Sequence, residues 1–159
     1  MLDAVLNASA FIAAFVAMEG VAWAVHRYVM HGPLWILHRS HHAPRAGGME
    51  ANDLFGLLFA AVAIALFCVG ADQRWSPLWW AAAGITVYGA LYALVHDALA
   101  HRRWGLPVRA RGRYLRGLVQ AHRLHHMTRT RTGAVSFGFL APRNVSRLAA
   151  ELRARSGRA

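Results

Sequence analysis

The chain has 159 residues, which is enough for one domain and too few for two of ordinary size. Hydrophobic residues make up 57% of the chain and are gathered into long runs, and the 18 basic residues, all of them arginine, outnumber the 7 acidic ones. Such a surplus suits either nucleic acid or an anionic membrane surface, but no nucleic-acid-binding module is recognisable, so the composition favours a membrane protein with no nucleic-acid partner.

Three apolar runs are each long enough to cross a bilayer, which needs about 20 residues of helix. The first run, 5–25, lacks the charged start of a signal peptide, so we interpret it as a membrane helix that leads directly into His26. The second run is 54–71, and the third, 78–95, opens with a Trp pair suited to the membrane interface and ends at His96. The sequence therefore predicts an all-α integral membrane bundle of three to four membrane helices with a histidine-rich helical cap.

The remainder of the chain contains no further run long enough to span a membrane. The apolar segment 133–142 is too short, and we expect it to lie in the interface or to pack on the cap. Residues 143–158 predict a short basic amphipathic helix, which either lies on anionic lipid or forms a solvated tail. We expect a single domain over 1–159, with a core of about 10–140 and a basic C-terminal tail, 143–159.

The arginines are distributed unevenly between the loops. Fourteen follow the third apolar run, whereas the turn between the second and third runs has only Arg74. The three between the first two runs are Arg27, Arg39 and Arg45. The positive-inside rule therefore predicts a protein of the cytoplasmic (inner) membrane with 26–53 and 96–159 on the cytoplasmic side.

All ten histidines fall into short clusters that form two copies of one pattern, HxxxxH followed by HxxHH. The HxxxxH pairs stand at the ends of the first and third runs, which cross the membrane in the same direction, so every cluster lies on the same side. Neutral imidazole is the commonest ligand for transition metals, and ten exceed what one four-coordinate site uses, so the pattern predicts two metals held together. The predicted ligands are His26, His31, His38, His41, His42, His96, His101, His122, His125 and His126.

The spacing within each cluster sets a geometric condition. The three histidines of HxxHH lie within roughly 100° on an α-helix and can converge on one point. Those of HxxxxH lie roughly 140° apart, so they share a site only if the helix ends, bends or bulges, or else they face different metals. Gly32-Pro33 directly after His31 favours a helix end there, and Gly105 and Pro107 follow His101 in a similar way.

Acidic residues near the clusters are candidates to orient the histidines by accepting a ring N–H. The candidates are Glu19, Glu50, Asp53 and Asp97. Asp97 is adjacent to His96, and its alternative role is an ion pair with an arginine such as Arg102. Glu19 lies within the first apolar run, two helical turns before His26, and an acid inside a membrane is a functional candidate in its own right.

The type of ligand narrows the choice of metal. Structural zinc often uses thiolates, copper favours Met or Cys, and soluble di-iron helical bundles are rich in Glu, whereas carboxylates are scarce here. An all-imidazole pair of metals at a membrane surface suits iron that activates O2 and attacks an unactivated C–H bond in a lipid-soluble substrate. The alternative from another class, a non-catalytic metal-binding transporter or sensor, is disfavoured because transport needs ligands near the bilayer midplane.

Several stretches of the chain resemble the bacterial β-carotene hydroxylases within the fatty acid hydroxylase/sterol desaturase superfamily. The matching stretches are HRYVMHG, WILHRSHH, EANDLFGLLFA, HDALAHRRW and AHRLHH. The resemblance implies a non-haem di-iron monooxygenase that uses O2 and electrons from reduced ferredoxin to hydroxylate C3 of β-ionone rings, converting β-carotene through β-cryptoxanthin to zeaxanthin.

The same resemblance implies that all ten histidines are iron ligands. It leaves open a carotenoid ketolase or a lipid hydroxylase or desaturase, which would share the site and differ in the pocket. Superfamily members usually have four membrane spans, whereas the hydropathy of this chain supports three.

Overall fold

The computed structural model describes residues 1–43, 48–141 and 143–157, and within these ranges the chain forms helices and loops but no strand. Three helices of the described part are long and apolar enough to cross a membrane. They are Leu2–Met30, Asp53–Asp72 and Ser76–Ala100. The predicted all-helical membrane bundle is confirmed, and so are its three spans; these described ranges contain no fourth.

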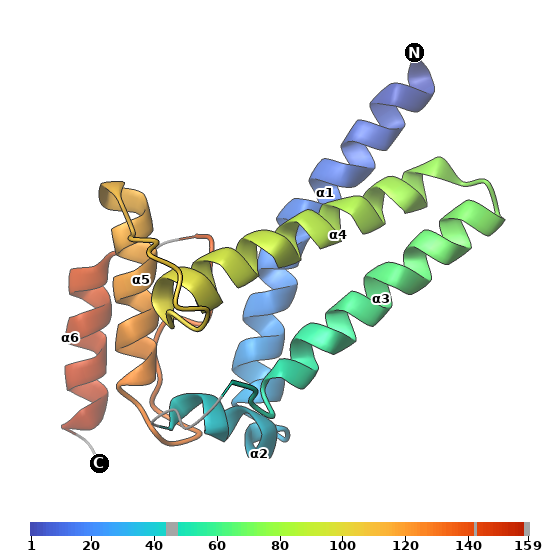
Figure 1. Ribbon diagram of the computed structural model, residues 1–159. Helices are drawn as coiled ribbons and strands as arrows, with labels where there is room; N and C mark the ends of the chain where they lie inside the picture. Colours follow the sequence, from blue (N-terminus) through green and yellow to red (C-terminus); the bar gives the residue numbers. More distant parts are fainter. Residues whose placement is uncertain (44–47, 142, 158–159) are drawn as a thin grey trace.

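Helix α4 (Ser76–Ala93) is the centre of the bundle, with α1 (Leu2–Ala24) and α3 (Asp53–Asp72) packed against it (Figure 1). The approach of α1 to α4 depends on Gly84, where an added Cβ would lie 2.4 Å from the carbonyl oxygen of Phe11. Small residues allow this close backbone packing between membrane helices, whose apolar surfaces gain no hydrophobic energy from leaving lipid.

The spans present apolar side chains to their surroundings. Ile12 and Val16 on α1 and Leu57 and Ile64 on α3 are all about three-fifths exposed, at 59%, 63%, 61% and 61%. Such a surface would be unfavourable in water and is the one that a lipid bilayer covers. The helices therefore owe their stability to lipid contact as well as to one another.

The spans that carry the histidine pairs do not end as α-helices. Helix α1 continues into a π-helical turn, η1 (Val25–Met30), and α4 continues into a second one, η3 (Leu94–Ala100). Beyond η1, the short helix α2 (Trp35–His38) runs into a 3-10 turn, η2 (Arg39–His42). These turns lie together at one end of the bundle.

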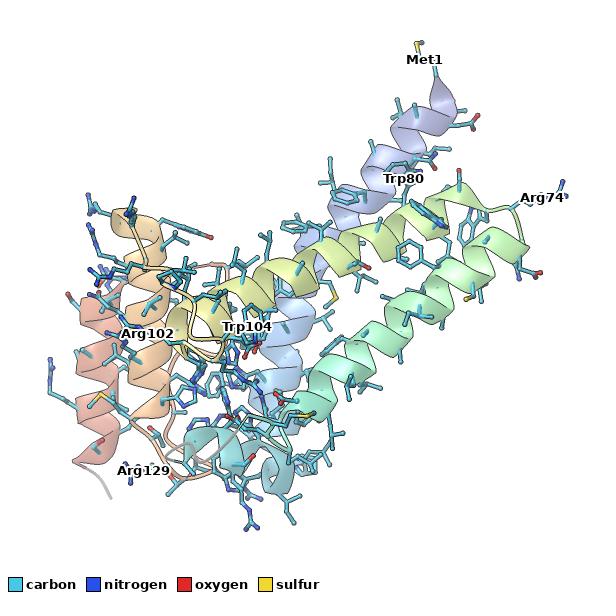
Figure 2. The ribbon with its side chains drawn as sticks, in the orientation of Figure 1. Met1, Arg74, Trp80, Arg102, Trp104 and Arg129 are labelled. Atoms are coloured by element: carbon cyan, nitrogen blue, oxygen red, sulfur yellow. The ribbon has the colours of Figure 1, made fainter. Side chains whose placement is uncertain are left out.

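Helix α5 (Gly112–His126) completes the cap at that end of the bundle, and side-chain nitrogens gather between it and the span ends (Figure 2). Met1, Arg74 and Trp80 mark the opposite end of the molecule, far from Arg102 and Arg129 (Figure 2). The histidine-rich helical cap predicted from the sequence is therefore confirmed.

The predicted C-terminal amphipathic helix forms as α6 (Val145–Ser156), but its apolar face does not lie on lipid. Leu148 and Leu152 are buried against Ala121 of α5 and against Val135. The expectation of a lipid-bound helix or a solvated tail is wrong, because α5 offers an apolar partner for that face.

Some sequence-based expectations fall outside the structural description. Arg45 and the last two positions of the 143–159 tail lie outside the described residues. The extent of a single domain over 1–159, with a core of about 10–140, stays a prediction.

Candidate metal centre

The π-helical turns explain how histidines five positions apart reach one site. In a π-helix the backbone hydrogen bonds join residues i and i+5. The His31 N–H donates to the His26 carbonyl at 3.0 Å, and the His101 N–H donates to the His96 carbonyl at 2.9 Å. The wider turn brings both members of each HxxxxH pair toward the same face. Of the alternatives that the spacing allows, the structure has a bulge in both pairs.

The chain turns sharply after the first of these pairs, and the turn requires glycine. A Cβ at Gly32 would lie 2.0 Å from the carbonyl oxygen of Tyr28, closer than any real contact. The tight turn lets α2 fold back so that the HxxHH that follows faces the HxxxxH. The helix end that Gly32-Pro33 predicts is present.

The histidines gather into two adjacent clusters. Cluster A consists of His26, His31, His38, His42 and His125, and cluster B consists of His41, His96, His101 and His122. Within each cluster, the candidate ligand nitrogens all lie within 4.8 Å of one another. His126 stands next to both, and its ring centroid lies 4.5 Å from that of His42 in cluster A and 4.4 Å from that of His122 in cluster B.

Each cluster takes one histidine from the other copy of the sequence repeat. His41 of the first HxxHH lies in cluster B, and His125, its counterpart in the second, lies in cluster A. The three histidines of an HxxHH can converge on one point of an α-helix, but here neither HxxHH places all three in one cluster. His41 and His42 are neighbours in the 3-10 turn η2, where successive residues project roughly 120° apart, so they point to different clusters.

Every ring in cluster A donates its Nδ1 proton to a neutral oxygen. The acceptors are the backbone carbonyls of Phe137, Arg131, Thr128 and Val135 and the side-chain carbonyl of Asn52, at 2.6–3.0 Å. These bonds fix the tautomer and the orientation of each imidazole. The Nε2 atoms are thereby left unprotonated and turned toward the centre of the cluster.

Two rings of cluster B donate to carboxylates instead. His41 Nδ1 lies 2.8 Å from Glu50 Oε2, and His96 Nδ1 lies 3.1 Å from Asp97 Oδ1. Two of the four candidate acids thus stand where an orienting carboxylate would stand. Asp97 also pairs with an arginine, at 3.1 Å, but the partner is Arg103 and not Arg102.

The third candidate acid, Asp53, supports this arrangement from behind. Its two oxygens each lie 2.6 Å from the Arg103 guanidinium, and Oδ2 accepts the Glu50 backbone N–H at 3.0 Å. Asp53 and Arg103 thus form a two-pronged ion pair. Arg103 therefore ties together the acids that face His41 and His96.

Glu19, the fourth candidate acid, does not orient a histidine but accepts hydrogen bonds from backbone N–H groups. Its carboxylate accepts N–H groups of Phe139, Leu140 and Ala141 at 2.7–3.1 Å and the Tyr88 hydroxyl at 2.8 Å. Non-helical backbone at membrane depth needs such partners, because lipid offers none. Glu19 thus reaches the site indirectly, by holding residues 134–141, which we call the covering segment.

The covering segment lies over both clusters. The Phe137 ring contacts His26, His31 and His125 of cluster A, with ring centroids 5.2–5.5 Å apart. The Phe139 ring contacts two rings of cluster B, each at 5.3 Å. The segment 133–142, expected in the interface or on the cap, therefore packs on the cap, with residue 142 outside the description.

The arrangement of Nε2 atoms fits a bound metal better than a hydrogen-bonded cluster. The Nε2–Nε2 distances are 3.2 Å for His26–His38, 3.2 Å for His31–His125, 3.1 Å for His38–His42 and 2.9 Å for His41–His96. Where both Nδ1 atoms carry the proton, two Nε2 lone pairs face each other and repel. Two nitrogens bound at about 2.1 Å to one metal, at right angles, are about 3.0 Å apart. A cation would therefore resolve these contacts.

Two further observations agree with a metal. His126 Nε2 is buried and has no hydrogen-bond partner among the described residues. Burial lowers the pKa of His42 to about 4, and it also lowers the pKa of His31, His122 and His125. These imidazoles are neutral at ordinary pH, which is the form that binds metals.

The sequence did not point to several residues of the site. Asn52 lies between Glu50 and Asp53, two acids that the sequence analysis identified, and Arg103 lies two residues after His101. Closeness in sequence to these residues was the only signal that could have pointed to them. The four carbonyl acceptors carried no signal, because any residue supplies a carbonyl. Their placement depends on how the loop after α5 folds over the clusters.

Comparisons with known proteins agree with this geometry. The family model described as fatty acid hydroxylase matches residues 11–142. A β-carotene hydroxylase of Pseudescherichia vulneris is 52% identical over 96% of this chain and 86% of the relative, and one of Pantoea ananas is 46% identical over 95% and 86%.

A more distant relative is the chloroplastic β-carotene 3-hydroxylase 2 of Arabidopsis thaliana, which is 39% identical over 84% of this chain and 45% of its own length. No solved structure is significantly similar to the chain. With a matched family model over most of its length and relatives of this identity, the chain belongs to the fatty acid hydroxylase family, in the branch that contains the bacterial β-carotene hydroxylases.

Proposed function

We propose that this chain is a membrane-bound di-iron monooxygenase that hydroxylates C3 of the β-ionone rings of carotenoids. Its product from β-carotene would be β-cryptoxanthin and then zeaxanthin. The observation that carries the proposal is the pair of adjacent all-imidazole clusters, which exchange one histidine each. The names of the bacterial relatives support the substrate, and the name of the Arabidopsis relative supports carbon 3.

The ten histidines divide naturally between two irons. The five residues of cluster A would hold one, and the four of cluster B, joined by His126, would hold the other. Iron bound there would supply the redox chemistry that places one oxygen atom of O2 into a C–H bond and reduces the other to water, with two electrons and two protons from outside. Zinc lacks this redox chemistry.

The remaining residues of the site would hold the ligands and keep water out. The acceptors at Nδ1 of the five cluster A rings and of His41 and His96 keep each proton away from the metal-facing nitrogen, so these imidazoles are ready to bind without rearrangement. The Phe137 and Phe139 rings cover the two clusters with apolar surface. Glu19 keeps this covering segment in place from within the first span.

We further propose that the histidine end faces the cytoplasm and that the protein resides in the inner membrane. Among the described residues, the turn between α3 and α4 at the far end carries only Arg74, whereas the histidine end is rich in arginine. This asymmetry follows the positive-inside rule. It would also place the site where a soluble electron donor can reach it.

Electrons would come from a ferredoxin-type donor. Exposed arginines follow the second HxxxxH, namely Arg102, Arg109, Arg111, Arg113 and Arg116. Arg103, which belongs to the same stretch, is instead engaged with two aspartates. An acidic donor would dock on such a surface, and lipid headgroup contact is the alternative role for these arginines.

Expression in cells that accumulate β-carotene tests the proposed function. Chromatography of the pigments should show β-cryptoxanthin and zeaxanthin. Ketolated pigments would replace this proposal with the ketolase alternative, and unchanged β-carotene would contradict it. His41→Ala should abolish conversion while the protein still inserts in the membrane, because cluster B has no spare ligand. Cys68→Ala, an exposed position on α3, is the matched control and should remain active.

A further inference from the structure

We propose that the two metal positions are unequal, with Glu50 and Asp97 making cluster B the stronger metal site and the one that favours the more oxidised metal. This inference rests on the proposed function, because it assumes that both clusters hold iron. It concerns the environment of the ligands and not their identity, since every ligand is an imidazole.

The inequality arises at the nitrogen that faces away from the metal. All five rings of cluster A donate to neutral carbonyl oxygens. In cluster B, His41 donates to Glu50 and His96 donates to Asp97. A hydrogen bond to a carboxylate is roughly twice as strong as one to a neutral acceptor. It draws the Nδ1 proton away from the ring and makes the opposite nitrogen a better electron donor.

Burial preserves the effect of these charges. The side chains of His41 and His96 are 1% and 4% exposed, and those of Glu50 and Asp97 are 12% and 18% exposed. At this depth water screens the carboxylates weakly, so each acts on its histidine nearly at full strength. A surface carboxylate at the same distance would have little influence.

Arg103 engages the two aspartates near cluster B unequally. Its guanidinium meets both oxygens of Asp53 at 2.6 Å, whereas it meets Asp97 through one contact at 3.1 Å. Asp97 therefore keeps its contact with His96 beside a single, longer contact with the arginine.

The two orienting acids should differ in strength. Asp97 divides its Oδ1 between His96 and Arg103, both at 3.1 Å. The contact between Glu50 and His41 is shorter, at 2.8 Å. We therefore expect Glu50 to contribute more than Asp97 to the affinity of cluster B.

Stepwise loading of the metal-free protein with Co2+, in competition with a chelator of known affinity, tests the inference. The wild type should bind two Co2+ in two steps, with the tighter step roughly 10–100-fold stronger, the range in which loss of such partners acts. Glu50→Gln should weaken only the tighter step, and Asp97→Asn should weaken it less.

A substitution at Asn52 provides the matched control, with the opposite expected effect to Glu50→Gln. It is the one side-chain acceptor of cluster A, at 2.6 Å from His38 Nδ1. Asn52→Asp places a carboxylate there and should strengthen only the weaker step. Mössbauer spectra of the iron-loaded protein provide a second measurement. The wild type should show two unequal iron signals. Glu50→Gln should change only the signal from cluster B, and Asn52→Asp only the signal from cluster A.

The outcomes separate this inference from the proposed function. Two Co2+ bound with equal affinity, or a Glu50→Gln variant with unchanged steps and spectra, would overturn the inequality and leave the di-iron proposal standing. Failure of the wild type to bind a second metal would overturn the proposed function itself. If Glu50→Gln does not fold, the Asp97→Asn and Asn52→Asp variants decide the matter.

Discussion

Replacement of Glu19 should detach the covering segment from the first span. Glu19→Ala removes the acceptor for the backbone N–H groups of Phe139, Leu140 and Ala141. A buried donor left without a partner costs about 1–3 kcal/mol, so the two at Phe139 and Leu140 amount to roughly 2–6 kcal/mol, whereas the exposed Ala141 N–H adds little. Lipid cannot replace these partners, although water that enters beside the segment would recover part of the cost.

The consequences should extend to cluster A. Carbonyls of the covering segment, at Phe137 and Val135, accept the Nδ1 protons of His26 and His125. Displacement of the segment therefore frees two of the five rings. Glu19→Ala should lower the melting temperature of the detergent-solubilised protein and reduce its metal content by about one ion per chain.

Two variants of the same contact serve as controls for this prediction. Tyr88→Phe removes only the hydroxyl partner of Glu19 and should cost about 1–2 kcal/mol with full metal content. Glu19→Gln keeps one oxygen for the backbone N–H groups, so its melting temperature and metal content should lie between those of Glu19→Ala and Tyr88→Phe. A Glu19→Ala protein with the melting temperature and metal content of the wild type would refute the anchoring role.

Two other predictions concern the arginines and the topology. Reversal of Arg109, Arg111 and Arg113 to glutamate should slow ferredoxin-driven turnover steeply with unchanged iron content, because complementary charge chiefly raises the association rate. Turnover that does not change with these substitutions or with ionic strength would show that the arginines contact lipid instead. A reporter fused after the last residue should be cytoplasmic and one inserted at position 73 periplasmic, and the reverse assignment would overturn the orientation drawn from arginine distribution.

Local spacing was enough to predict some features of the site. The spacing of HxxxxH allowed the two histidines to share a site only if the helix ends, bends or bulges, and Gly32-Pro33 favoured an end; the structure has a bulge and then an end. The three spans followed from the length of their apolar runs. These features depend on residues close in sequence, whose geometry helix periodicity dictates.

Other features depend on how distant segments pack. The exchange of His41 and His125 requires α5 to lie against η2, which no local spacing encodes. Glu19 was singled out as an acid in a span, but its partners lie 120 residues further on. The apolar face of α6 suits lipid and protein equally well, and the sequence did not identify α5 as its partner.

Metal analysis of the purified protein is the most direct test of the central claim. The protein would be expressed with ample iron, extracted from membranes in a mild detergent and analysed for iron and zinc against an independent measure of protein concentration. Two histidine clusters of this geometry predict two irons per chain and little zinc. One zinc per chain and no iron would contradict the account.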